Sequence, residues 1–181
     1  MIRLLDGTKA YIQAIIDNYS RRILAWRVDA KLEPGATALL LVKAFRGKDQ
    51  GGAADNAPQS LMVDGGVENM NRAVNEICSQ GLLKLILAQT DLVFSNSMIE
   101  AFWRTLKHQW LYLNNLDTIA AVRRLVRFYI DEHNSTLPHS ALKGLTPDEV
   151  YSGTGEHVLE ELELGKKNAR EARIEANRAL A

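Results

Sequence analysis

The feature that most constrains the fold is a short apolar run that ends abruptly at an acidic turn. Residues 61–63 are Leu-Met-Val, and Asp64-Gly65-Gly66 follows at once, which is typical of a buried strand that ends in a tight turn. A helical pattern from about Glu68 to Gln80 and a second apolar run at 82–88 come next. This order of strand, helix and strand predicts an α/β fold with Asp64 at the mouth of a sheet.

A second carboxylate, Glu100, lies in a strongly periodic segment. Apolar residues recur around it at steps of three and four, as in a helix that buries one face: Ile99, Phe102, Trp103, Leu106 and Trp110. Phosphoryl-transfer sites often hold Mg²⁺ with one or two carboxylates and the phosphates of the substrate. Asp64 and Glu100 are therefore candidate metal ligands, although Asp-Gly is also a common turn and a single helical Glu is commonly solvated.

Strands are predicted before this unit and helices after it. Apolar runs at 2–5, 11–16 and 23–28 predict three antiparallel strands, the first two joined by the Asp6-Gly7 turn. A helix at 36–45 and a polar loop at 47–60 lead to the strand that carries Asp64.

Two further helices are predicted beyond Glu100. The first covers 117–134, and the second is a short helix to Tyr151, with Thr146 as N-cap and Pro147 at its first position. The first carries a basic cluster that is either a solvated face or a contact for backbone phosphates: Arg123, Arg124 and Arg127. His133 and His139 lack the cysteines or histidine spacing of a zinc site, and we interpret His139 as structural.

The sequence changes character at about Gly153. Residues 156–181 are charged and rich in alanine, with an acidic half before a basic half and an expected helix break near Gly165. They have too few large apolar side chains for a core of their own. We therefore predict a globular domain at 1–152 and, at 153–181, a projecting helical tail that packs on a partner protomer or frays.

Composition restricts the partners and the compartment. The 22 Lys and Arg residues equal the 22 Asp and Glu residues in number, so any contact with nucleic acid depends on local patches. The single cysteine, Cys78, excludes an intrachain disulfide. Neither a signal peptide nor a long apolar run is evident, which predicts a soluble cytoplasmic protein without a membrane partner.

Four separated motifs give a family resemblance. LMVDGGVEN and SNSMIEAFWRTLK carry the two carboxylates, IIDNYSRRILAW lies near the start, and NSTLPHSALKGLTPDEVY lies near the end. In this order they resemble the catalytic core of the DDE-type insertion-sequence transposases and retroviral integrases, over roughly residues 1 to 152. The resemblance implies an RNase H-like α/β fold: a five-stranded mixed sheet, three antiparallel strands and then two parallel ones, flanked by helices.

The resemblance also implies a site and its partners. Asp64 and Glu100 would be catalytic ligands of Mg²⁺ or Mn²⁺ in a two-metal site, and Lys107 would hold a DNA phosphate. Arg104 and Asn96 match the same segment, although Arg104 has the spacing of a surface ion pair with Glu100 and Asn96 that of a helix cap. The implied partners are element ends and target DNA, bound by a homo-oligomer in the bacterial nucleoid.

One carboxylate of the resembled family is not found in its usual context. The family carries its first catalytic Asp in a Trp-x-x-Asp-x-Thr segment, and we expect this chain to start a few residues after that position. Asp6 is the nearest substitute, but it belongs to a turn. Three functions therefore stay open: a metal-dependent transposase, a non-catalytic fragment that binds DNA or a full-length transposase, and an RNase H-like nuclease for branched or hybrid substrates.

Overall fold

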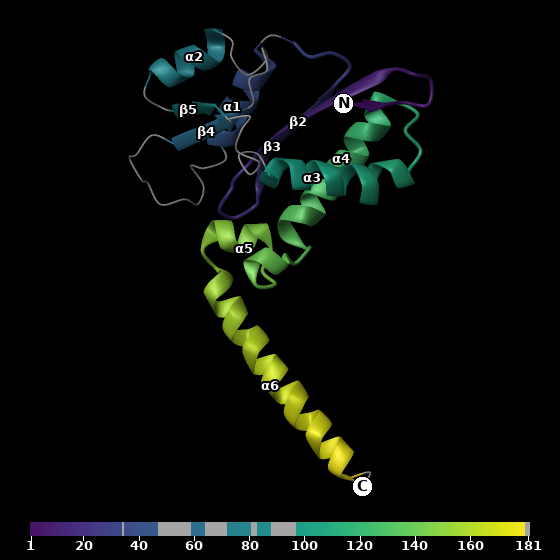
Figure 1. The fold of residues 1–181 in the computed structure, drawn as a ribbon, viewed down its shortest axis with the longest axis vertical. Coiled ribbons are helices and arrows are strands. Elements are labelled where there is room, and N and C mark those ends of the chain that lie inside the picture. Colours follow the sequence, from purple (N-terminus) through teal and green to yellow (C-terminus); the bar gives the residue numbers. More distant parts are fainter. Residues whose placement is uncertain (34, 47–58, 64–71, 81–82, 88–96, 180–181) are drawn as a thin grey trace.

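The computed structural model describes residues 1–33, 35–46, 59–63, 72–80, 83–87 and 97–179. Strands and helices form an α/β body, from which the last helix projects (Figure 1). In chain order the elements are β1 (Ile2–Arg3), β2 (Lys9–Ile16), β3 (Ile23–Asp29), α1 (Ala36–Arg46), β4 (Gln59–Val63), α2 (Arg72–Ser79), β5 (Leu83–Leu87), α3 (Ser97–Gln109), η2 (Leu111–Leu113), α4 (Ile119–Ser135), η3 (Ser140–Leu142), α5 (Pro147–Ser152) and α6 (Gly155–Ala179).

The first three strands form the predicted antiparallel sheet, with β2 in the middle. The β1–β2 turn depends on Asp6, whose Oδ1 accepts the N–H of Thr8 at 2.8 Å, and on Gly7, which has the positive φ of 85° that glycine adopts without strain. The β2–β3 register runs from Tyr11 opposite Asp29 to Ile16 opposite Ile23. Asp6 is thus a turn residue, as the sequence indicates.

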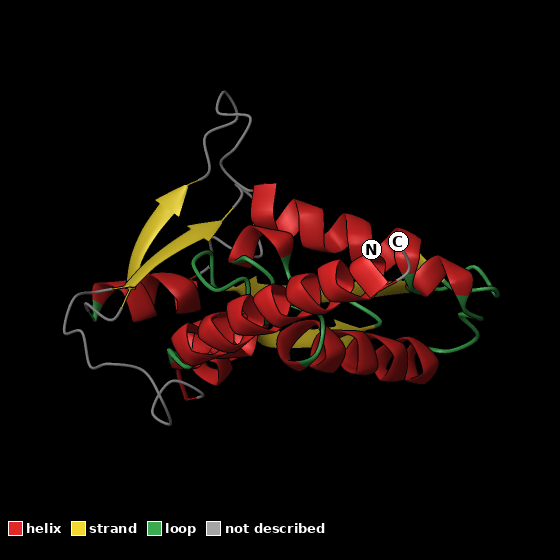
Figure 2. Cartoon of the chain, turned by 90° about the horizontal axis from the view of Figure 1, so that it is seen from below, coloured by secondary structure: helices red, strands yellow, loops and turns green. Residues whose placement is uncertain are grey.

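The parallel strands stand apart from this sheet. β4 and β5 pair with each other from Gln59 opposite Leu83 to Val63 opposite Leu87, and Figure 2 shows the pair separate from the antiparallel strands. The predicted single five-stranded sheet is not confirmed, because no pairing among the described strands joins β4 to β1, β2 or β3. β1 is only two residues long, so most of the second edge of β2 has no described strand beside it to continue the sheet.

Helices cover both faces of the antiparallel sheet. On one face, α1 buries Leu40 and Ala44 against Ala25 of β3, and its Leu41 meets Val74 of α2. On the other face lies the main core, which joins the sheet to α3, η2 and α4 and includes these buried residues: Ile2, Leu4, Ala10, Ile23, Val28, Phe102, Leu106, Leu111, Leu116, Val122, Val126, Tyr129 and Ile130. The main core therefore fixes α3 and α4 on one side of the sheet.

The C-terminal elements confirm one local prediction and correct another. Thr146 and Glu149 form a reciprocal capping box at the start of α5, with Pro147 in the first turn. α6, however, is a single helix that passes through Gly165, so the predicted break there is wrong. A glycine inside a helix costs only about 1 kcal/mol relative to alanine, too little to interrupt a segment rich in Ala, Glu, Lys and Arg.

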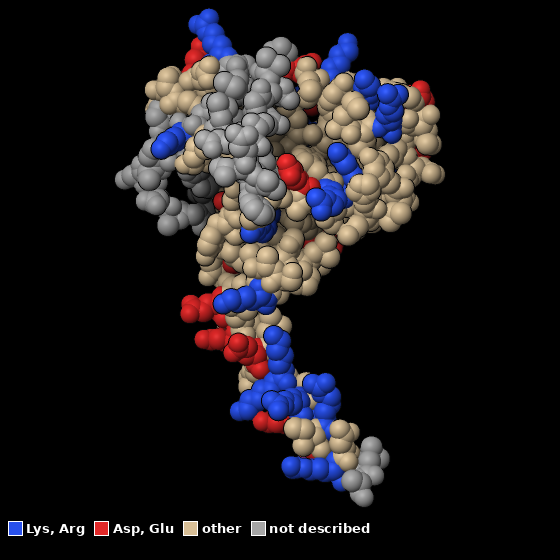
Figure 3. Space-filling model, viewed as in Figure 1, with Lys and Arg blue, Asp and Glu red and all other residues tan. Residues whose placement is uncertain are grey.

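α6 is exposed along nearly its whole length. Only Gly155, at its first position, is buried. Figure 3 shows acidic side chains near the body and basic ones farther along the helix, in agreement with the order of Glu160, Glu161 and Glu163 before Lys166, Lys167 and Arg170. None of the described helices is long and apolar enough to cross a lipid bilayer.

Candidate functional site

α3, which carries Glu100, is held in place by its buried face. Phe102 and Leu106 are buried in the main core, and the Phe102 ring lies 5.2 Å from the His133 ring of α4 in an edge-on contact. Just after α3, the Trp110 indole donates from Nε1 to the carbonyl oxygen of Leu125 at 3.0 Å and stacks on Phe128 at 5.2 Å. The helix and the residue after it are thus bound to α4 by both packing and a hydrogen bond.

The opposite face of α3 is charged. Glu100 and Arg104 are exposed, and Lys107 is half-buried. Spacings of four and seven residues place these three side chains on one side of the helix. No ion pair joins Glu100 to Arg104, although both belong to the described residues, so the simple surface pair allowed by the sequence does not form.

The helix dipole offers a simpler explanation for part of this arrangement. Glu100 lies in the first turn of α3 and Lys107 in its last turn, where a negative and a positive charge respectively are favoured. The dipole does not explain the positive charge of Arg104 in the middle of the helix. Lys107 also lies near the start of β1: the pKa of the Met1 amino group is lowered, mainly by burial and secondarily by the positive charge of Lys107.

The other predicted site residues are not brought together by the described part of the chain. β4 is described up to Val63, and both Asp64 and Asn96 lie outside the described residues. Asp6 is exposed in the β1–β2 turn, where the hydrogen bond from Thr8 lowers the pKa of its carboxyl group. Among the described residues, no group of three or more His, Cys, Asp or Glu side chains has the arrangement of a metal site.

One segment of the chain matches a known family model. Residues 83–147, which cover β5, α3, η2, α4 and η3, match the model of the integrase core domain. Over this segment the chain is similar to integrase core domains.

Solved structures show the same fold. The catalytic core domain of BIV integrase superposes with a TM-score of 0.61 at 16% identity, over 88% of this chain and 93% of that one. The HTLV-2 integrase catalytic core domain, solved in complex with magnesium, superposes with a TM-score of 0.57 at 11% identity, over 82% and 88% of the two chains. The chain thus shares the α/β fold of these catalytic core domains.

Sequence relatives come from bacterial insertion elements. The putative transposase InsK of insertion sequence element IS150 from Escherichia coli is 24% identical over 150 residues, which are 83% of this chain and 51% of that protein. An uncharacterized protein of insertion element IS136 from Agrobacterium fabrum is 27% identical over 145 residues, 78% of this chain and 73% of that protein. The chain spans about half the length of the first of these relatives.

The structure contains a contact that local sequence patterns do not predict. Asn134, at the end of α4, accepts the N–H of Ile23 at 2.9 Å through Oδ1 and donates to the carbonyl oxygen of Ile23 at 3.1 Å through Nδ2. Arg22 bonds Asp148 of α5 at 2.5 Å and lies 4.7 Å from the centre of the Tyr151 ring. The motifs IIDNYSRRILAW and NSTLPHSALKGLTPDEVY, far apart in sequence, therefore pack on each other. We call this contact the hairpin clasp.

Two histidines, His133 just before the second motif and His139 within it, belong to the same contact. His133 Nε2 lies 3.0 Å from the carbonyl oxygen of Arg21, and the His133 and His139 rings meet edge-on at 4.6 Å. The pKa of each is lowered, chiefly by burial, which favours the neutral rings. The structure thus gives them packing partners in the hairpin clasp, consistent with the structural role expected for His139.

Proposed function

We propose that this protein is an integrase core that acts in DNA transposition, by metal-dependent phosphoryl transfer at the ends of a mobile element. The observation that carries the proposal is α3: a helix fixed by its buried face presents Glu100, Arg104 and Lys107 on its other side, without an ion pair between Glu100 and Arg104. The integrase core match over this helix and the relatives from insertion elements support the same activity.

In this proposal Asp64 and Glu100 hold Mg²⁺ or Mn²⁺. Glu100 fits that role because it offers an exposed carboxylate to a cation that prefers oxygen ligands. The magnesium complex of the related HTLV-2 integrase core supports the choice of metal. When bound, the ion supplies Lewis-acid stabilisation of the attacking and leaving oxygens, and intact homologues are expected to hold two such ions.

The cationic residues of α3 orient the DNA. Lys107 contacts a phosphate near the scissile bond, Arg104 contacts the same strand one turn earlier, and Asn96 lines the site. Lys107 is suited to this role because its side chain, half-buried against the body, carries the positive charge that a phosphate attracts. We further propose that 1–152 form the catalytic domain, that the protein acts as a homo-oligomer on DNA in the bacterial nucleoid, and that 153–181 serve as a tail.

A second candidate is a non-catalytic fragment that binds DNA or a full-length transposase and inhibits it. The observation that favours it is the placement of Asp6. Its carboxylate is engaged by Thr8 in an exposed turn, an arrangement suited to shaping the turn rather than to bridging metal ions.

The test is nicking and strand transfer on duplexes that carry the terminal repeats of the encoding element, with Mg²⁺ or Mn²⁺. If the chain is the enzyme, Glu100→Gln abolishes nicking while retaining DNA binding. The matched control is Glu171→Gln, an exposed glutamate on α6, which should keep wild-type nicking.

Three other outcomes are distinct. Absence of nicking in every variant, with DNA or transposase binding retained, supports the inhibitory fragment. Preference for a branched substrate over a linear element end supports a nuclease instead. Absence of both nicking and binding refutes the transposition proposal and the fragment proposal together.

A further inference from the structure

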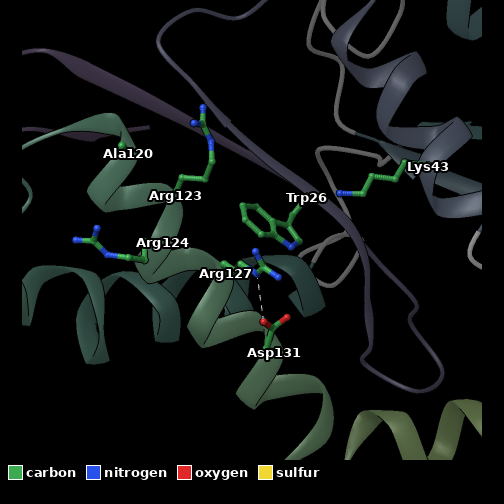
Figure 4. A pocket seen from close by; sticks show the side chains of 7 residues that line it. All are labelled: Trp26, Lys43, Ala120, Arg123, Arg124, Arg127 and Asp131. Atoms are coloured by element: carbon green, nitrogen blue, oxygen red, sulfur yellow. Dashed lines mark ion pairs between the residues drawn. The ribbon is translucent and has the colours of Figure 1, made fainter.

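A basic hollow lies at the β3 edge of the antiparallel sheet, and no residue of α3 lines it. It has a volume of about 580 Å³ and is open to solvent. β3 is the outermost strand there, with α1 on one face of the sheet and α4 on the other. The residues that line the hollow come from these three elements: Trp26, Lys43, Ala120, Arg123, Arg124, Arg127 and Asp131 (Figure 4). We call it the β3 hollow.

The β3 hollow is strongly positive. Four of its lining residues are cationic and one is acidic, which leaves a net charge of +3 in a chain whose total net charge is zero. The one acidic residue, Asp131, is a weak counterion, because its contact with Arg127 is 3.7 Å long and both side chains are about two-thirds or more exposed. Local charge of this kind attracts a polyanion even when the whole chain is neutral.

The four cations do not all have the same role. The Arg123 guanidinium donates to the carbonyl oxygen of Val28 at 2.8 Å, so it is partly used to hold α4 against β3. In Figure 4 the Lys43 amine points from α1 toward the Trp26 ring, whereas the Arg124 guanidinium points to the other side, away from the ring. Lys43, Arg124 and Arg127 are exposed and are not used in this way, so they are the cations available to a ligand, spread over the width of the hollow.

Trp26 adds an aromatic surface. Its side chain packs partly on the main core and stays half-buried, so part of the indole faces the β3 hollow. Lys43 Nζ is 5.8 Å from the centre of the ring, near the outer limit of a cation–π contact, and therefore covers it loosely. An indole beside separated cations is the arrangement with which proteins hold single-stranded nucleic acid: the cations bind the backbone and the ring stacks on a base.

We propose that the β3 hollow is a second nucleic-acid site that binds a single DNA strand. Lys43, Arg124 and Arg127 contact its phosphates, and Trp26 stacks on one base. The proposal rests on the proposed function only for the choice of DNA as the polymer. The proposal adds a DNA contact on α1, β3 and α4 to the one proposed on α3. Such a contact suits a DNA strand that extends beyond the site of chemistry.

The experiment measures binding of the full chain to a fluorescent oligothymidylate by anisotropy, in EDTA and at roughly 50 to 200 mM salt. The test variant is Arg124→Glu with Arg127→Glu. The control is Arg170→Glu with Arg173→Glu, which makes the same charge change on the exposed part of α6. Circular dichroism verifies that each variant folds, and the milder pair Arg124→Gln with Arg127→Gln gives a second measurement if the charge reversal unfolds the chain.

The test variant, Arg124→Glu with Arg127→Glu, is called the hollow variant. It is expected to bind the oligonucleotide about tenfold or more weakly. The magnitude of the slope of log K against log salt should fall by about 1.4, the value for two single-strand phosphates. Trp26→Leu should weaken binding about fivefold with the slope unchanged, because stacking releases no counterions. The α6 control should bind like the wild type. An equal loss in the hollow variant and the α6 control, or a loss in neither, overturns the proposal.

Two further measurements separate other ligands. If millimolar inorganic phosphate at constant ionic strength displaces the oligonucleotide completely, the hollow is a small-anion site and the proposal fails. It also fails if sedimentation shows a dimer that only the hollow variant dissociates, because a second copy of the chain then occupies the surface. Glu100→Gln should bind the oligonucleotide normally, so loss of nicking and loss of strand binding stay distinguishable.

Discussion

α4 and α6 are both long helices, but they are stabilised in different ways. α4 has 17 residues and buries six of them, including Val122, Val126 and Ile130 in the main core and Asn134 in the hairpin clasp. α6 has 25 residues and buries only Gly155. The first helix is therefore fixed by tertiary packing, and the second depends on alanine-rich composition and local pairs such as His157 with Glu161. The difference follows the supply of large apolar side chains, which are frequent in α4 and sparse in α6.

The largest expected difference between a packed and an exposed helix position comes from leucine truncation. Leu106 is fully buried where α3 meets α4, whereas Leu164 on α6 is 59% exposed. Leu106→Ala should lower the free energy of unfolding by about 2–5 kcal/mol because it removes buried methyl groups and leaves a cavity. Leu164→Ala should change it by less than about 0.5 kcal/mol. Urea denaturation measures both, and similar losses would contradict this comparison.

The hairpin clasp should give the next largest effect. Asn134→Ala removes the donor and acceptor that satisfy the Ile23 backbone, at a cost of about 1–3 kcal/mol of stability. The matched substitution on α6, Asn168→Ala, replaces an exposed asparagine by a better helix former and should be neutral or slightly stabilising. The same denaturation experiment tests the pair. An unchanged stability in Asn134→Ala would mean that water replaces the lost partner.

The pH dependence of stability should also separate the two regions. The pKa values of His133 and His139 are lowered from 6.5 by burial, so the unfolded chain takes up protons more readily than the folded one. The contribution of the two neutral rings to the free energy of unfolding is complete above pH 6.5, and it is lost as the pH falls through their folded-state pKa values. Stability should therefore decline below pH 6.5, as unfolding by urea at a series of pH values would show.

Substitution of these histidines provides the control for that decline. In the double variant His133→Gln with His139→Gln, stability should change less with pH in the mildly acidic range, whatever its absolute value. His157→Gln, an exposed histidine on α6, should keep the wild-type slope. If stability falls equally with pH in the wild type, the double variant and His157→Gln, other groups cause the acid sensitivity.

The smallest expected effect concerns the continuity of α6. Gly165→Ala should raise helix stability locally by about 0.5–1 kcal/mol, since no heavy atom lies within 4 Å of a Cβ added there. Helical circular dichroism should rise slightly, while the midpoint of urea unfolding of the body should stay unchanged. A shift of that midpoint would show that α6 packs on the body more closely than its exposure indicates.

Local patterns predicted much of this molecule. Helix periodicity located α1, α3 and α4 within a few residues, and the Thr146-Pro147 signal located the start of α5, because each depends on neighbours a few positions away. The charged face of α3 followed from the same periodicity. Gly165 was misjudged because the cost of one glycine is small compared with the combined propensity of its neighbours.

Contacts between distant segments could not be predicted in this way. Arg22 and Asp148 are 126 residues apart, and Asn134 and Ile23 are 111 residues apart. Nothing in the local spacing of either segment specifies its partner. For the same reason the sequence indicated the arginine cluster of α4 but not that Trp26 and Lys43 lie beside it, because α1, β3 and α4 meet only in the folded chain.

The side chains that bond to β3 also bear on how the protein behaves at high concentration. An outer strand with free N–H and C=O groups can pair with a strand of another molecule and start aggregation. Here Asn134 occupies both backbone groups of Ile23 near one end of β3, and Arg123 occupies the carbonyl oxygen of Val28 near the other. α4 thus blocks intermolecular pairing near both ends of this strand, and variants that remove both side chains should lose solubility before they lose the fold.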